Sequence, residues 1–414
     1  MAYPQGSMSL LRARFAPALA AAALAVSACR GRDAPSAVQI LTSPAGPGAG
    51  ESNLTVGGDG KVYLSWLEPA ADSQVAFRFS VFEGDAWSAP RDIRVARDFF
   101  VNWADFPSLS VRADGRMAAH WLQRFGPTSY AYDVRVAQSA DTGRTWGEAY
   151  APHVDRSRTE KGFVTLWPEG DGFGAVWLDG RNADKAKPNP RQEMMLYSSP
   201  AVGVARATEV PLDARTCDCC QTTVALTANG PIVAYRDRTA DEIRDIFVVR
   251  RVGGKWTDPV PVHDDGWRID GCPVNGPMLA AAGNRVAIAW FTSAADTSRV
   301  NVAFSSDAGA TFGPPTQMDE GNPAGRVAVA LLPDGSALVS WVERAEGSAA
   351  SVLVRRVREK EGAGPASTVT ASTSARASGF PRMVVAGDHA YFSWTAPGAP
   401  SEVRVARASL AGLP

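Results

Sequence analysis

Cysteines are the residues of this sequence with the most chemical potential. The 414-residue chain has five, and three of them, Cys217, Cys219 and Cys220, fall within the stretch TCDCCQ. A fourth, Cys272, lies further along the chain. Thiolates bind soft metal ions, pair into disulfides in oxidising compartments, and carry out redox exchange where their pKa is lowered. Which of these three chemistries applies depends on the cellular compartment of the protein and on where the cysteines lie in the fold.

Arginine-rich segments are the second resource, because guanidinium groups bind carboxylates and phosphates in a bidentate fashion. These segments also contain Asp, Asn and Trp, which suit sugar or anion binding. Each arginine could instead pair with a nearby carboxylate such as Asp179 or Asp237, and Trp103 and Trp267 could plug the fold rather than stack on a sugar. The ligand-binding candidates are Arg181, Arg236, Asp237, Arg238, Trp267, Arg268, Asp270, Asn275 and Arg382.

The N-terminus indicates the compartment. Arg12 and Arg14 precede the apolar run FAPALAAAALAVSAC, which has the charged start, short apolar centre and small-residue end of a secretory signal. Its last four residues resemble the bacterial lipobox, whose cysteine is lipidated. We therefore expect a signal peptide over 1–28, a lipidated Cys29 with a tether over 29–36, and an exported protein held at a membrane by lipid; an ordinary cleaved signal is the alternative.

Composition limits the classes of partner that we expect and the chemistry that the cysteines can carry out. The formal net charge is −1, so no overall field favours nucleic acid. The four histidines show no zinc-finger spacing, and the sequence suggests no cofactor or metal. With Cys29 used by lipid, an even number of cysteines remains in an oxidising compartment, which favours disulfides over a thiolate metal site or a redox pair. We expect a monomer.

Seven repeats of an apolar strand, a tight turn and a second strand ending in an aromatic run along the chain, and a third and fourth strand follow in most units. This pattern predicts an all-β propeller over 37–414, with seven four-stranded blades, or six if one unit is an insertion. The last unit stops after its third strand, and AVQILTS near the N-terminus can complete it and close the ring. The closing aromatics are Trp66, Trp121, Trp177, Tyr235, Trp290, Trp341 and Trp394.

Two units contain the motif S-x-D-x-G-x-T-[WF] after the third strand, at SADTGRTW and SSDAGATF. The motif resembles the Asp box of the sialidase-like (BNR) β-propellers, and the resemblance covers nearly the whole of 37–414. It implies that the aspartates accept turn hydrogen bonds, that the glycines adopt positive φ, and that the aromatics pack between blades. The motif residues are Ser139, Asp141, Gly143, Thr145, Trp146, Ser305, Asp307, Gly309, Thr311 and Phe312.

The repeat register separates two faces. The short turns and the Asp boxes lie on one face, and the long loops that lead into each blade lie on the other, where binding sites usually form. Cys217, Cys219, Cys220 and Cys272 fall in two adjacent loops of this second face. We expect disulfides that link these loops through Cys272; a bond between neighbours Cys219 and Cys220 would be strained, and the other pairings stay open.

Sialidases, by resemblance, use several arginines, an Asp acid/base, and a Tyr nucleophile with a Glu partner. Here the N-terminal Arg-Ile-Pro motif is missing, no Tyr/Glu pair can be assigned, and nothing local singles out Asp105 as an acid. The sequence therefore favours a propeller that binds a glycan or another anionic ligand on its loop-rich face. The alternatives are an exo-α-sialidase-type hydrolase and, on the cysteines alone, a periplasmic metal- or redox-linked protein.

Overall fold

A computed structural model describes residues 38–126, 131–182, 194–202 and 209–413. The chain divides into two units, Met1–Ser36 and Ala37–Pro414, and the second contains all of the described residues. The expected signal peptide, the lipidated Cys29 and the tether lie outside the described residues. In the described part, no helix has the length and apolar character that crossing a bilayer requires.

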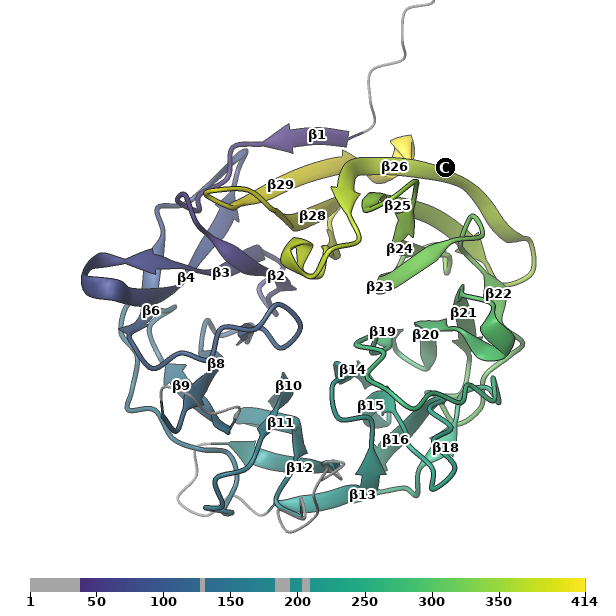
Figure 1. Ribbon diagram of the computed structural model, residues 1–414, viewed down its shortest axis with the longest axis horizontal. Coiled ribbons are helices and arrows are strands. Elements are labelled where there is room, and N and C mark those ends of the chain that lie inside the picture. Colours follow the sequence, from purple (N-terminus) through teal and green to yellow (C-terminus); the bar gives the residue numbers. More distant parts are fainter. Residues whose placement is uncertain (1–37, 127–130, 183–193, 203–208, 414) are drawn as a thin grey trace, which may run out of the picture. The chain divides into compact units, whose positions relative to one another are not determined.

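The second unit is a ring of seven antiparallel sheets around a central axis (Figure 1). We call these sheets blades 1 to 7, in chain order of their innermost strands. Blades 1 to 3 consist of β2 (Gly50–Val56), β3 (Val62–Ala70), β4 (Gln74–Glu83), β5 (Ala86–Trp87) and β6 (Arg91–Ala96); β7 (Ser108–Val111), β8 (Met117–Arg124) and β9 (Tyr132–Ser139); and β10 (Lys161–Glu169), β11 (Gly172–Asp179), β12 (Met194–Val202) and β13 (Val210–Thr216).

Blades 4 to 6 continue the same order of strands from the axis outward. They consist of β14 (Thr223–Thr227), β15 (Gly230–Arg236), β16 (Ile246–Val252), β17 (Lys255–Trp256) and β18 (Val260–Pro261); β19 (Met278–Ala282), β20 (Arg285–Thr292), β21 (Arg299–Ser305) and β22 (Thr316–Gln317); and β23 (Pro323–Leu331), β24 (Ala337–Arg344), β25 (Ala349–Arg358) and β26 (Gly362–Thr373). Short 3-10 turns occur at η1 (Ala71–Ser73), η2 (Ala294–Asp296), η3 (Arg376–Ser378) and η4 (Leu410–Gly412).

Blade 7 closes the ring as the sequence predicts. It contains β27 (Arg382–Ala386), β28 (His389–Ala396), β29 (Glu402–Ser409) and, on its outside, β1 (Val38–Leu41). Strand β1 pairs antiparallel with β29, from Val38 opposite Ala408 to Leu41 opposite Val405. Pairing the first strand with the last blade joins the two ends of the chain without an open break in the ring. The seven-blade prediction is confirmed, and the six-blade alternative is wrong.

The closing aromatics form the core between blades. Trp66, Trp177 and Trp290 are completely buried, and the other four are at most 3% exposed. In three of them, a carboxylate two residues along the same strand accepts the indole N–H. The bonds run from Trp66 to Glu68 (2.5 Å), from Trp177 to Asp179 (2.9 Å) and from Trp341 to Glu343 (2.6 Å). Each such pair buries a large ring without leaving its N–H unpaired.

The two S-x-D-x-G-x-T-[WF] segments form the same turn. Asp141 accepts hydrogen bonds from the Thr145 N–H (2.9 Å) and hydroxyl (2.6 Å), and Asp307 accepts the same pair from Thr311 (2.9 and 2.7 Å). Gly309 has φ +76°, and a Cβ there would lie 2.2 Å from the side chain of Ile232 in blade 4. The glycine is therefore required both by conformation and by the approach of the preceding blade.

Candidate functional site

The four cysteines lie in the two loops that lead into blades 4 and 5, and they form two disulfides. Cys217 pairs with Cys220 inside the first loop, and Cys219 pairs with Cys272 of the second. The predicted disulfides and the crosslink through Cys272 are confirmed, and the pairing is one of those that the sequence left open. Within TCDCCQ, Cys217 and Cys220 also have the C-x-x-C spacing of dithiol redox motifs.

The predicted arginines do not gather around one site. Arg181 makes a bidentate contact with Asp179 (3.0 and 2.6 Å) and a second with Glu209, and its guanidinium lies 3.9 Å from the Tyr197 ring centroid. Both carboxylates already occupy its donors. Arg181 therefore pairs with Asp179, as in the alternative to ligand binding that the sequence offered.

Arg236 is a buried structural residue, 1% exposed. Its guanidinium donates to three backbone carbonyls, those of Asn275 (2.9 Å), Arg244 (2.5 Å) and Phe291 (2.6 Å). The Trp267 ring, itself 5% exposed, lies 4.8 Å from the same guanidinium. Burial lowers the pKa of Arg236 to about 9, so the side chain remains charged at neutral pH. It joins the loops of blades 4 and 5 from the inside.

The remaining candidates on blades 4 and 5 also serve internal contacts or lie on the surface. Arg238 is 2% exposed and pairs with Glu242 (3.0 Å) and Asp218 (2.8 Å). Asp237 is buried, and this burial raises its pKa to about 7. The Asn275 side chain accepts the Arg326 N–H (2.7 Å) and donates to backbone carbonyls. Arg268 and Asp270 are exposed.

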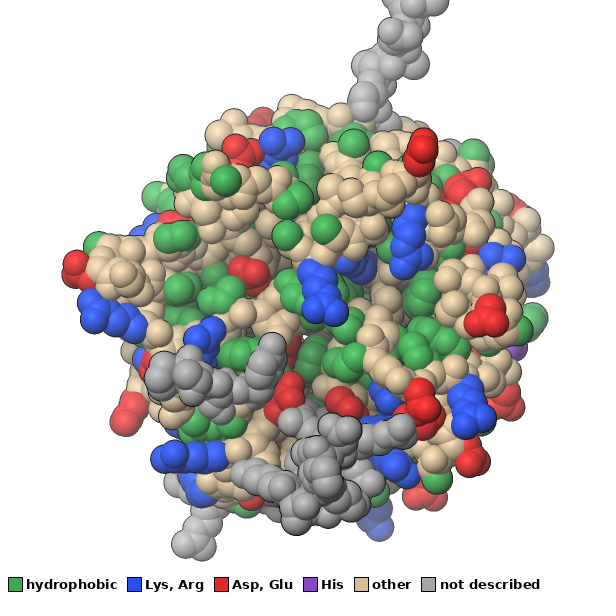
Figure 2. All heavy atoms as spheres, viewed as in Figure 1, with side chains coloured by type: hydrophobic (Ala, Val, Ile, Leu, Met, Phe, Trp, Pro, Cys, Tyr) green, Lys and Arg blue, Asp and Glu red, His purple; other side chains and the backbone are tan. Residues whose placement is uncertain are grey.

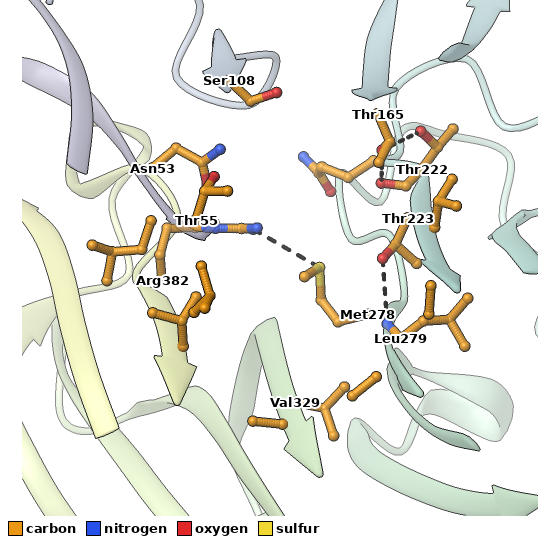
Figure 3. A pocket seen from close by; sticks show the side chains of 18 of the residues that line it. Asn53, Thr55, Ser108, Thr165, Thr222, Thr223, Met278, Leu279, Val329 and Arg382 are labelled. Carbon is orange, nitrogen blue, oxygen red and sulfur yellow. Dashed lines mark hydrogen bonds between the residues drawn. The ribbon is translucent and has the colours of Figure 1, made fainter. Parts of the chain in front are cut away.

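Arg382 differs from the other predicted arginines, because it lies on the channel along the axis (Figure 3). It belongs to β27, is half-buried, and reaches across to Met278, with 3.8 Å between Nη1 and Sδ. Its guanidinium also lies 5.3 Å from the Phe106 ring centroid. Burial lowers its pKa to about 10. Among the described residues, no carboxylate forms an ion pair with it. The positive charge of Arg382 therefore faces the cavity without a neutralising partner there.

The cavity around Arg382 has a volume of about 560 Å³ and is lined by the innermost strands of all seven blades. This is within the usual range for small-ligand sites, about 300–1,000 Å³. In six blades, the lining residue lies opposite the residue that precedes the closing aromatic. In blade 6 the corresponding residue is Ala328, opposite Ser340, and it does not line the cavity. The six residues are Asn53, Ser108, Thr165, Thr223, Met278 and Arg382.

Five of these six lining residues are polar, and the six include one cation and no anion. Asn53 is 5% exposed, and its Oδ1 has no hydrogen-bond partner among the described residues. Figure 3 shows the Asn53, Ser108, Thr165 and Arg382 side chains around the same space. A buried amide oxygen without a partner costs free energy unless a ligand or water donates to it. These six residues therefore offer a charged donor, hydroxyls and an unpaired acceptor to whatever fills the cavity.

Asp105 is the one carboxylic acid among the described lining residues, and it is 3% exposed. It accepts the Phe163 N–H (2.9 Å), and its Oδ2 lies 3.3 Å from the Tyr132 hydroxyl, which donates to Glu160 (2.7 Å). Burial, and then the charge of Glu160, raise the pKa of Asp105 to about 8. A protonated Asp105 can donate to Tyr132 while Tyr132 donates to Glu160, and the cavity then keeps the full charge of Arg382.

The segment Asn102–Phe106 precedes β7, contacts residues of several blades, and lines the channel with Ala104, Asp105 and Phe106. Gln221 donates to the Ala104 carbonyl (2.7 Å) and accepts the Gly276 N–H (2.9 Å). The Trp103 ring stacks on Phe380, with centroids 5.7 Å apart, and the Arg326 guanidinium lies 5.2 Å from it. Trp103 is half-buried and packs against these two side chains. In the face shown in Figure 2, charged side chains of both signs surround apolar side chains near the centre.

Known protein structures resemble this chain in fold. No protein-family model matches the chain, and no curated protein matches it. The GH93 α-L-arabinofuranosidase of Fusarium graminearum is 14% identical, with a TM-score of 0.52 over 91% of this chain and 98% of that one. This likeness shows the fold, a β-propeller.

Two sialidases are also similar to this chain in structure. A Hadza microbial sialidase is 16% identical, with a TM-score of 0.43 over 71% of this chain and 63% of that one. The Trypanosoma rangeli sialidase is 12% identical, with a TM-score of 0.44 over 79% and 56%. The chain thus spans less than two thirds of either enzyme.

Sequence reasoning missed Asn53, Ser108, Tyr132 and Glu160. Asn53 and Ser108 could have been found, because the repeat register alone gives the position opposite the residue before each aromatic. Tyr132 and Glu160 carry no such signal, since their contact joins the start of β9 to the loop before β10.

Proposed function

We propose that this propeller binds an anionic glycan, or another small anionic ligand with hydroxyl groups, in the cavity around Arg382. The observation that supports this most directly is a half-buried cation with no carboxylate partner among the described residues, beside the unpaired Oδ1 of Asn53. A ligand carboxylate would complete the bonding of the guanidinium, and a ligand hydroxyl would donate to the amide oxygen.

The test is binding of acidic and neutral glycans to the purified protein, first on an array and then by calorimetry. We expect acidic glycans to bind, and Arg382→Met to weaken binding by about 10- to 100-fold, the usual contribution of a charge-assisted hydrogen bond. Arg268→Met is the matched control, because it removes an exposed arginine outside the cavity. Equal binding by wild type and Arg382→Met would refute the proposal.

Hydrolysis is the second candidate, and it rests on the contact of Tyr132 with Glu160 and Asp105. A Tyr nucleophile with a Glu partner and an Asp acid is the set that sialidases use. Two observations favour binding instead. Tyr132 is 1% exposed beneath Phe100, whose ring stacks on it at 4.1 Å, and burial raises its pKa well above the usual value. A nucleophile needs the opposite shift and contact with substrate.

Turnover of fluorogenic sialosides and arabinofuranosides separates these two functions. Under the binding proposal, wild type releases no fluorophore while it still binds acidic glycans. Turnover that is lost in Tyr132→Phe and in Asp105→Asn, with both variants folded, would instead establish a hydrolase.

We also propose that the protein is exported and lipidated at Cys29, on the pattern of its first residues. A radiolabelled fatty acid should be incorporated into wild type and not into Cys29→Ser, and only wild type should partition into detergent. Incorporation into both proteins, or into neither, would contradict the lipid anchor.

A further inference from the structure

The two disulfides differ in accessibility. Cys217 and Cys220 are each 1% exposed, whereas Cys219 is half-buried and Cys272 is exposed. An external thiol can therefore approach the Cys219–Cys272 bridge at Cys272, but the Cys217–Cys220 bridge lies beneath the surface. Reduction should begin at the outer bridge, since exchange requires a thiolate to reach a disulfide sulfur.

The inner bridge lies within reach of Cys219. The Sγ atoms of Cys217, Cys219 and Cys220 are all within 4.8 Å of one another, and those of Cys217 and Cys219 are 3.9 Å apart. Once Cys219 loses its bond to Cys272, its sulfur has a second disulfide as its neighbour. Disulfide exchange needs only this contact and a thiolate.

A buried cation lies beside these sulfur atoms. The Arg244 side chain is 3% exposed, donates from Nη1 to Cys217 Sγ at 3.5 Å, and uses Nη2 to contact Glu242 at 2.9 Å. Cys217 stays in a disulfide during exchange, but the Cys219 and Cys220 Sγ atoms lie within 4.8 Å of it. A guanidinium beside this cluster lowers the pKa of the thiols that form there and so raises the fraction of thiolate at neutral pH. Both the position of the sulfur atoms and the local charge therefore favour exchange.

We infer that the four cysteines form a thiol–disulfide relay, with Cys272 as its external end and Cys219 as the residue that passes the exchange inward. A dithiol first reduces Cys219–Cys272, releasing two thiols and becoming a cyclic disulfide. The Cys219 thiolate then attacks Cys217 Sγ, a Cys217–Cys219 bond forms, and Cys220 leaves as the thiolate. This second step has no net oxidation or reduction.

The relay connects thiol chemistry to the channel. Cys272 is freed from the loop that leads into blade 4, and Gln221 of that loop holds both Ala104, which lines the channel, and Gly276 of the neighbouring loop. Exchange at the cysteines would thus release the disulfide link between these loops.

The sharpest test uses the full chain with Cys272→Ser, which leaves Cys219 without its partner and needs no reductant. The folded protein is alkylated with iodoacetamide at neutral pH, and fragment mass spectra then assign the label; Cys29 lies in a separate peptide. The relay predicts label on both Cys219 and Cys220. Label confined to Cys219 at every time point would overturn it.

Wild type provides an independent measurement if Cys272→Ser does not fold. After one equivalent of dithiothreitol, with the fold monitored by circular dichroism, the relay predicts label on Cys272 and on Cys220. Label on Cys219 and Cys272 alone, or no label before unfolding, would overturn it. In Cys272→Ser, adding Arg244→Gln should move the alkylation midpoint to higher pH, toward the ordinary thiol value of about 8.5.

Discussion

Replacing Arg382 with Met should stabilise the protein while it removes ligand binding. Met retains much of the length and apolar bulk of the side chain and deletes its charge. The structure indicates that the charge is costly, because Arg382 lies on the cavity wall and, among the described residues, has no ion-pair partner. Residues kept for binding often destabilise the protein that carries them.

The size of the effect follows from the pKa of Arg382. Burial lowers it from the usual arginine value to about 10, and each unit corresponds to about 1.4 kcal/mol, so the charge costs at most about 3 kcal/mol. Since the guanidinium faces the cavity, water screens part of this cost. Losing the contact with the Phe106 ring removes about 0.5–1 kcal/mol of stabilisation. We expect the Met variant to be about 1–2 kcal/mol more stable.

The charge of Arg382 destabilises the folded protein throughout the physiological pH range. A cation whose pKa is lower in the folded state destabilises folding at every pH below both values, and the penalty disappears only as pH rises above about 10. At pH 7 the whole penalty is present, so stability can be measured under the conditions used for binding.

Thermal unfolding of wild type, Arg382→Met and Arg268→Met measures this prediction. The first variant should unfold about 1–4 °C above wild type, and the exposed control should change stability by less than about 0.5 kcal/mol. A lower midpoint for Arg382→Met would refute the reasoning, because it would mean that the guanidinium stabilises the channel. The proposed binding role would then lose its physical basis.

Three further perturbations test the internal contacts. Arg236→Met leaves three backbone carbonyls without their donor, so we expect a loss of about 3 kcal/mol or more, measured by urea denaturation; unchanged stability would contradict its structural role. Gly162→Ala places a Cβ 2.0 Å from Asp105 Oδ2, and overpacking should cost about 1–3 kcal/mol, whereas an unchanged melting temperature would show that the site yields freely. Because the pKa of Asp105 is raised to about 8, the stability of wild type relative to Asp105→Asn should fall as pH rises from about 4 to 8, and parallel pH profiles would disprove the shift.

Local patterns were sufficient to predict the architecture. Strand alternation, turn residues and the spacing of Trp66 to Trp394 are properties of short segments, and each blade repeats them. The same register placed TCDCCQ and Cys272 in adjacent loops, so the crosslink could be predicted although the pairing could not. A closed ring also follows from the sequence, because the last blade lacks a strand and the N-terminus supplies one.

The roles of the arginines could not be predicted in this way. Arg181, Arg236 and Arg382 all occupy strands or loops near the same face, but one pairs with carboxylates, one with backbone carbonyls, and one faces the cavity. Asp179 lies two residues from Arg181, whereas the partners of Arg236 lie as far away in sequence as Phe291. Only contacts between residues close in the sequence, such as that of Arg181 with Asp179, can be recognised from the sequence.

The sequence by itself determined the number of blades, their closure and the face that carries the long loops, because these depend on repeated short-range patterns. Tertiary structure alone decided which side chains reach the axis with their charge or polar atoms unpaired, and which cysteine lies beside which. Those outcomes depend on how seven blades converge, and convergence brings together residues that are far apart in the chain.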